Sequence, residues 1–76
     1  MTLDKLKRGE WGEVLQVKGE GMTRLRMLEM GIVPGTEIQL RKAAPLGDPI
    51  EIGLRGYVLT IRRNDARLID IRRRMR

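Results

Sequence analysis

Hydrophobic and polar residues alternate along several short stretches of the chain, a pattern typical of half-buried strands. The clearest stretch is 36–42, where Ile38 and Leu40 fall on one face and Glu37, Gln39 and Arg41 on the other. Related patterns predict strands at 11–18, 50–54, 57–61 and 69–71. In the stretch 11–18, both faces carry apolar residues, so the pattern does not show which face points toward the core. The pattern predicts about five short strands.

The run 24–30 favours a helix, because it contains no proline, glycine or β-branched residue. Thr23 is the expected N-cap. Gly31 is expected to end the helix in a left-handed conformation, which would pack Ile32 against Met27. The following Pro34-Gly35 pair has the residue types of a type II turn. A short helix is therefore expected between the first two strands.

The apolar residues of this helix do not form one stripe. Met22, Leu25 and Leu28 fall on one side, which is expected to face the core. The other side carries two methionines edged by arginines, the composition of an adaptable contact surface. The candidate partner-binding residues are Arg24, Arg26, Met27 and Met30. The alternative is that both methionines are buried under the 45–49 loop.

The segment 43–49 is expected to be an ordered loop, because its prolines cannot donate to a central sheet. The residues assigned to this loop are Pro45, Gly47, Asp48 and Pro49. Further along, residues 62–67 are expected to supply a capping side chain followed by one tight helical turn. Residues 72–76 are expected to be a basic tail. Near the N-terminus, Leu3 and Leu6 predict one turn that covers an end of the sheet.

A sheet this small removes its exposed edges by curling closed. The predicted fold class is therefore mostly β, an SH3-like small barrel of about five strands with one short helix between the first two. An OB-fold is the competing architecture. No repeat or linker interrupts the 76 residues, so a single domain over 1–76 is expected.

Composition narrows the chemistry. The chain has neither histidine nor cysteine, which removes the usual general bases, nucleophiles and soft metal ligands, and its glycines form no phosphate-binding loop. No catalytic residue, cofactor or metal site is expected. The net charge of +6 favours anionic partners, including a membrane surface contacted by the arginine-rich C-terminus. Nucleic acid is disfavoured, because one Trp and one Tyr make a poor stacking surface. Without a long apolar run, a cytoplasmic location is expected, peripheral to the inner membrane if the C-terminus binds it.

Several motifs, taken in order, resemble the FeoA family, the small cytosolic component of bacterial ferrous iron transport. They are RMLEMG at 26–31, PGT at 34–36, APLGDP at 44–49 and DA at 65–66. Methionine stands at Met27 and Met30, where the family often has leucine. The resemblance implies an SH3-like fold and a helper role beside FeoB, the membrane subunit whose cytosolic part is a GTPase.

The predicted function is a non-enzymatic accessory that binds the cytosolic side of a FeoB-type transporter. The alternative is a regulatory or nucleic-acid-binding barrel, because a similar domain ends some iron-dependent repressors. A third hypothesis is that Arg24 or Arg26 acts as an arginine finger on the partner GTPase.

Overall fold

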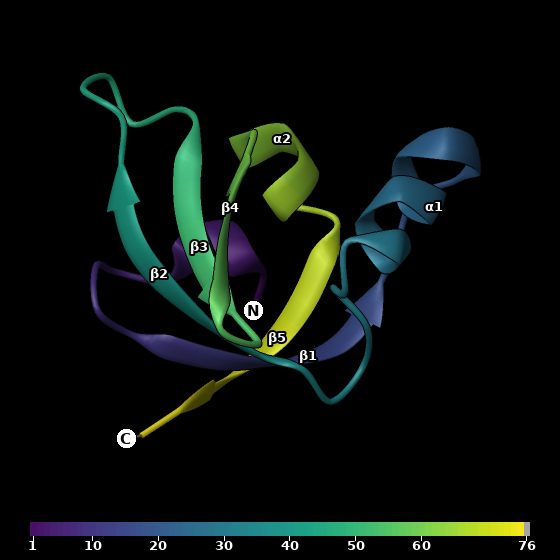
Figure 1. Ribbon diagram of the computed structural model, residues 1–76, viewed down its shortest axis with the longest axis horizontal. Coiled ribbons are helices and arrows are strands. Elements are labelled where there is room, and N and C mark those ends of the chain that lie inside the picture. Colours follow the sequence, from purple (N-terminus) through teal and green to yellow (C-terminus); the bar gives the residue numbers. More distant parts are fainter. Residues whose placement is uncertain (76) are drawn as a thin grey trace.

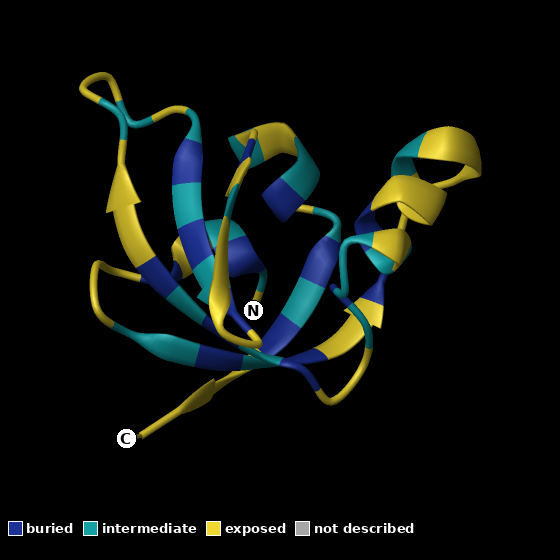
Figure 2. Cartoon of the chain, viewed as in Figure 1, coloured by how far each residue is buried: buried dark blue, intermediate teal, exposed yellow. Residues whose placement is uncertain are grey.

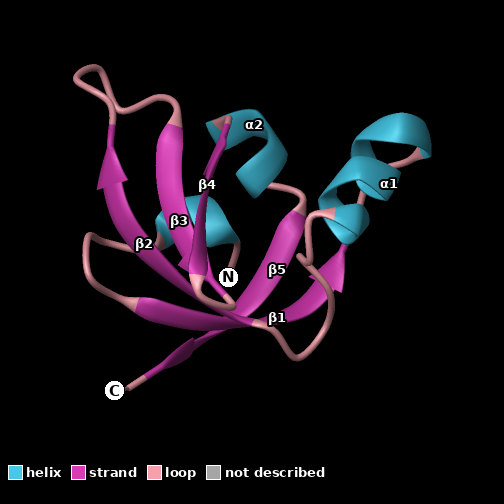
Figure 3. Cartoon of the chain, viewed as in Figure 1, coloured by secondary structure: helices cyan, strands magenta, loops and turns pink. Residues whose placement is uncertain are grey.

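A computed structural model describes residues 1–75. Five antiparallel strands form one curved sheet in the order β4-β3-β2-β1-β5 (Figure 1). The only elements besides strands in this described part are short helices, one of which, α1, connects β1 to β2 (Figure 3). The elements are η1 (Leu3–Lys5), β1 (Trp11–Val17), α1 (Gly21–Glu29), β2 (Glu37–Ala43), β3 (Ile50–Leu54), β4 (Tyr57–Ile61), α2 (Arg63–Ala66) and β5 (Ile69–Arg74).

The core lies on the concave side of the sheet and is made almost entirely of aliphatic side chains. Ile38 and Leu40 of β2 point inward as their alternation predicts, and so do Ile50 and Ile52 of β3. Leu3 of η1 is fully buried, which confirms that this turn covers the core. Each such side chain contributes about 1.5–3 kcal/mol relative to exposure, so burial of this set dominates the stability of a small domain.

A bulge in β1 explains why its sequence pattern is ambiguous. The pairing of β1 with β5 shifts register between Val14 and Gln16. Val14 and Val17 are both buried as a result, although their odd spacing would place them on opposite faces of a regular strand. Gly12 is required for close approach, because a Cβ there would lie 2.6 Å from Cδ1 of Ile71.

The C-terminal end of α1 has the predicted geometry. Gly31 has a φ of +94°, and its N–H donates to the carbonyl of Leu28 at 3.0 Å. The N–H of Ile32 donates to the carbonyl of Met27 at 3.1 Å, which completes a Schellman motif. The Pro34-Gly35 turn is confirmed by the 3.0 Å hydrogen bond from Thr36 to Val33.

The N-terminal end of α1 differs from the prediction. Thr23 lies inside the helix, which begins at Gly21, and the N-cap Glu20 makes no side-chain capping bond. The residues at this end are exposed, so water can satisfy the free N–H groups of the first turn. A side-chain cap is therefore not needed to start the helix.

The C-terminal region also departs from the prediction. Strand β5 continues to Arg74, so residues 72–74 belong to the sheet rather than to a tail. The reason is that β1 supplies hydrogen-bonding partners along this whole length, pairing Glu13 with Arg72 and Trp11 with Arg74. Residue 76 of the predicted tail lies outside the described residues.

Candidate functional site

Helix α1 projects from the sheet with most of its surface exposed (Figure 2). Met22 is 69% exposed and Leu25 is 47% exposed, whereas Met27 is 2% exposed. The predicted orientation of the helix is therefore wrong. The Schellman motif accounts for the difference, because it packs the residue after Gly31 against Met27 and so turns that side of the helix inward. Met22 and Leu25 lie on the opposite side.

The four predicted partner-binding residues do not form one surface. Met27 is part of the core, and Met30 is partly buried against it. Arg24 donates from Nε to the carbonyl of Val17 at 3.1 Å, so its side chain folds back on the end of β1. Arg26 is exposed. Figure 1 places α1 and the β2–β3 loop at opposite ends of the molecule, so Met27 is buried but does not lie under that loop.

The exposed side of α1 forms a different surface, which the helix spacing brings together. Met22, Leu25, Arg26 and Glu29 are separated by three, four and seven residues and therefore share one side of the helix. We call these four residues the outer face of α1. The sequence shows that Met22 and Leu25 share one side of the helix, but it does not show that this side faces solvent.

The β3–β4 hairpin holds the C-terminal end of α1. Arg55 and Gly56 have φ values of +49° and +84°, as a type I′ hairpin turn requires. Arg55 donates from Nη2 to Oγ1 of Thr36 at 3.1 Å, and the Thr36 hydroxyl donates to the carbonyl of Gly31 at 3.1 Å. A cation near the C-terminal end of a helix also complements its dipole. The hairpin thereby fixes the angle at which α1 leaves the sheet.

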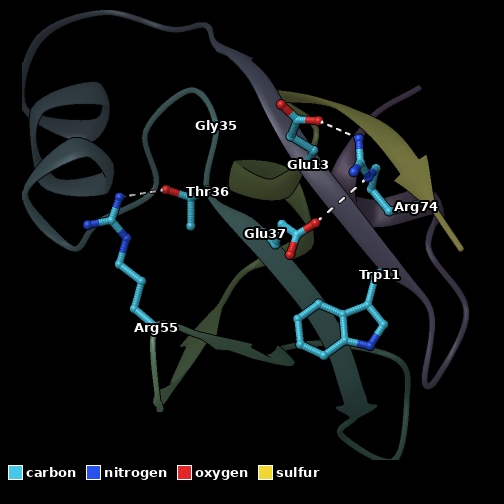
Figure 4. Close-up of a pocket in the computed structure, with 7 residues that line it drawn as sticks. All are labelled: Trp11, Glu13, Gly35, Thr36, Glu37, Arg55 and Arg74. Atoms are coloured by element: carbon cyan, nitrogen blue, oxygen red, sulfur yellow. Dashed lines mark hydrogen bonds and ion pairs between the residues drawn. The ribbon is translucent and has the colours of Figure 1, made fainter. Parts of the chain in front are cut away.

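A cleft of about 620 Å³ opens between β1, β2 and this hairpin (Figure 4). Glu13 and Glu37 stand directly opposite each other on β1 and β2. Arg74 lies between them, 3.1 Å from Oε1 of Glu13 and 3.7 Å from Oε2 of Glu37. The lining residues are Trp11, Glu13, Gly35, Thr36, Glu37, Arg55 and Arg74. Sequence reasoning missed this cleft, because its residues come from distant segments.

The charged side chains and the hydroxyl of the cleft already contact partners within the protein. Glu13 and Glu37 are paired with Arg74, and Thr36, the one hydroxyl in the lining, already donates to the carbonyl of Gly31. No lining residue is a histidine or a cysteine. Among residues 1–75, no three Asp, Glu, His or Cys side chains come together as a metal-binding group.

The β2–β3 loop is ordered by a distant arginine. Arg63 donates from Nε to the carbonyl of Gly47 and from Nη1 to the carbonyl of Asp4, the latter at 3.0 Å. Asp48 accepts a 3.0 Å hydrogen bond from the main-chain N–H of Arg63, which caps α2. The cap predicted from within 62–67 is not formed, since the N-cap Arg62 makes no side-chain capping bond. Through Gly47 and Asp48, the loop is therefore connected to the first residue of α2.

Some of the C-terminal arginines form ion pairs with carboxylates of the same chain. Arg73 lies 3.7 Å from Glu10, and Arg74 bridges the two carboxylates of the cleft. Arg72 is exposed. In the described part of the chain, no helix has the length and apolarity needed to cross a membrane.

The sequence model of the FeoA domain matches residues 1–73. This chain belongs to the FeoA family. It is 38% identical over 71 residues to the Fe(2+) transport protein A/Fe(2+) transporter FeoB fusion protein of Porphyromonas gingivalis, and the match covers 93% of this chain. The chain spans 8% of the length of that curated relative.

Solved FeoA structures share the fold closely. The FeoA protein from Chlorobium tepidum is 42% identical with a TM-score of 0.87, covering 93% of this chain and 68% of that one. The FeoA-like protein from Clostridium acetobutylicum is 34% identical with a TM-score of 0.91, covering 100% and 88% respectively. The FeoA domain described above thus has the architecture of its family.

Two further structures, each under 25% identical, share the fold alone. The zinc complex of Stenotrophomonas maltophilia FeoA, described as an SH3 domain protein, has 22% identity and a TM-score of 0.84, covering 95% of this chain and 89% of that one. A manganese-dependent transcriptional repressor has 13% identity and a TM-score of 0.87, covering 96% and 36%. The predicted SH3-like fold of this FeoA family member is confirmed.

Proposed function

We propose that this chain is a non-enzymatic accessory of ferrous iron uptake that binds the cytosolic side of a FeoB-type transporter, at or near its GTPase region. The observation that carries the proposal is the Porphyromonas gingivalis relative, in which an Fe(2+) transport protein A and an FeoB are parts of one polypeptide. Covalent fusion raises the effective concentration of one part near the other, which is useful when the two act together. A cytoplasmic location beside the membrane follows from this role.

The outer face of α1 is the contact surface we assign to the transporter. It combines two exposed apolar side chains, Met22 and Leu25, with the charged groups of Arg26 and Glu29. Methionine adapts its shape to a partner at low cost, and charged residues at the rim supply orientation. Of the predicted patch, only Arg26 belongs to this face, because Arg24 folds back on Val17 and Met30 is partly buried against the core. Arg26 is the better candidate for an arginine finger, because the guanidinium of Arg24 donates to the main-chain carbonyl of Val17.

The experiment is co-purification with membranes that contain a FeoB-type transporter, compared with membranes that lack it. The double variant Met22→Gln/Leu25→Gln should lose binding at least tenfold, because both changes remove apolar contact area. Its thermal unfolding should match that of the parent, since both side chains are already exposed.

The matched control is Leu46→Gln. Leu46 is fully exposed, at 102%, and lies in the β2–β3 loop at the end of the molecule away from α1. This variant also replaces an exposed leucine by glutamine, so it should retain binding. Equal binding by the α1 variant and the Leu46 variant would place the interface elsewhere. Equal capture by membranes with and without the transporter would contradict the proposed function itself.

The alternative function is a regulatory barrel that acts with nucleic acid. The fold shared with the manganese-dependent repressor favours it, although that likeness concerns the fold alone. Binding to duplex DNA at physiological salt distinguishes the two functions, because a dedicated nucleic-acid surface retains affinity there. We expect no saturable binding under those conditions.

A further inference from the structure

The two edge strands of the sheet are protected very differently. The outer edge of β5 is covered by the N-terminus, where Ile71 donates its N–H to the carbonyl of Met1 at 2.8 Å and Thr2 pairs with Asp70. Charged side chains also line β5, as is usual for protected edges. Strand β4 lies at the other end of the sheet, with β3 as its neighbour.

Strand β4 lacks the charges, the proline and the bulge that commonly protect an edge strand. Its sequence, YVLTI, contains no charged residue and no proline, in a chain of which 34% of residues are charged. Its pairing with β3 is regular over all five residues, so no bulge twists the edge away. Val58 is 49% exposed, and Thr60 is exposed as well. This edge therefore has the composition of a strand that is suited to accept another.

The hairpin register fixes which main-chain groups point outward. A two-residue turn makes Leu54 and Tyr57 a hydrogen-bonded pair. Antiparallel pairs alternate, so Leu59 and Ile61 also turn their main-chain groups toward β3. The N–H and C=O groups of Val58 and Thr60 then face away from β3. Among residues 1–75, no main-chain hydrogen bond joins Val58 or Thr60 to a segment outside the sheet.

Charge around the edge selects the kind of strand it would accept. Arg62 directly follows β4, and Arg55 precedes it by two residues. Both are exposed, although Arg55 also donates to Oγ1 of Thr36. The nearest carboxylate across the ladder is Glu51, opposite Thr60, and it is neutralised by Arg41 at 3.2 Å and Lys42 at 3.9 Å. The local balance is positive, which favours a segment with acidic residues at its ends.

A second copy of this chain fits the edge less well. Symmetric antiparallel pairing that uses the free groups would place Val58 opposite Thr60 of the other copy. The same register would bring Arg62 beside the other copy's Arg55, which places like charges next to each other. The net charge of +6 on each copy adds to this repulsion.

We propose that the β4 edge accepts an extended segment of a partner protein as a sixth strand of the sheet, with β-branched residues at its centre and carboxylates at both ends. The main-chain groups of Val58 and Thr60 supply the hydrogen bonds, and the flanking arginines supply orientation. This surface is separate from the outer face of α1, and the inference does not depend on the identity of the transporter.

The test uses a synthetic peptide of alternating threonine and valine with two aspartates at each end, added to the full-length isotope-labelled protein. Amide hydrogen exchange by NMR should show new protection at Val58 and Thr60. Tyr57, Leu59 and Ile61 should change little, because their amides already face β3. A peptide with lysines in place of the aspartates should bind at least tenfold more weakly.

Two sets of N-methylated peptides test the main-chain contacts without altering the protein. Methylation of the amides that face β4 should abolish binding, while methylation of the alternate amides should preserve it. In the protein, Thr60→Pro removes an outward N–H and should weaken binding about tenfold, whereas Thr60→Val keeps that N–H and should bind like the parent.

Four results would overturn the proposal. The first is equal binding of both methylated sets, the second is tighter binding of the lysine peptide than of the aspartate peptide, and the third is protection spread over residues outside β4. Protection of Val58 and Thr60 that rises with protein concentration in the absence of peptide would also overturn it, since a second copy would then be the occupant.

Discussion

The hydroxyl of Tyr57 donates a hydrogen bond to the main-chain carbonyl of Met30, the C-cap residue of α1. This contact joins the β3–β4 hairpin to the one helix that projects from the sheet. Together with the Arg55–Thr36–Gly31 connection, it satisfies the carbonyl of the C-cap residue and the carbonyl of Gly31 just beyond it. The direction of α1, and therefore of its outer face, depends on a hairpin that lies more than twenty residues away in the sequence.

Gly31→Ala should destabilise the protein for two separable reasons. The left-handed conformation costs a residue with a Cβ about 1–2 kcal/mol. In addition, the new Cβ would lie 2.7 Å from the Tyr57 hydroxyl. Tyr57→Phe removes that hydroxyl, so the double variant should lose about 1 kcal/mol less than the sum of the two single losses. Urea unfolding of the four proteins gives the coupling, and strictly additive losses would contradict it.

Asp48→Ala should cost about 1 kcal/mol, because the carboxylate caps the first N–H of α2. Asp48→Asn is the matched control, since its amide oxygen can accept the same hydrogen bond. Thermal unfolding should show a clear decrease for alanine and a small one for asparagine. If both variants unfold like the parent, the capping contact makes no contribution.

Arg74→Gln should destabilise the protein more at low salt than at high salt. The two carboxylates of the Glu13–Glu37 pair face each other across β1 and β2, and Arg74 lies within ion-pair distance of both. The side chains are partly exposed, so the loss should be about 0.5–1 kcal/mol. Adding Glu13→Gln removes the repulsion and should restore most of the loss. A loss independent of salt would indicate that packing of the arginine stem matters more than its charge.

Gly12→Ala should cost about 1–3 kcal/mol, because its Cβ would lie 2.6 Å from Cδ1 of Ile71 in a packed core. Ile71→Val removes that methyl group and should make the alanine at position 12 tolerable. Gly53→Ala is a milder comparison, since its Cβ would meet the flexible side chain of Arg41 at 3.2 Å. Equal unfolding midpoints for the Gly12 and Gly53 variants would show that β1 relaxes at the close approach.

The sequence by itself determined the features that depend on neighbouring residues. Alternation of apolar side chains located β2 and β3, since a strand exposes alternate residues to opposite faces wherever it lies. The glycine that ends α1 and the Pro34-Gly35 turn were also predictable, because left-handed backbone and turn geometry are local properties of these residue types.

The tertiary structure alone decided which side of α1 faces the core, because a short helix with apolar residues on several sides satisfies more than one orientation. Contact with the hairpin and the Schellman motif buries Met27 and leaves Met22 exposed. Likewise, Arg74 joins the sheet only because β1 lies beside it, and Asp48 caps α2 only because the fold brings that loop there. Contacts between distant segments depend on the whole sheet, so no local pattern encodes them.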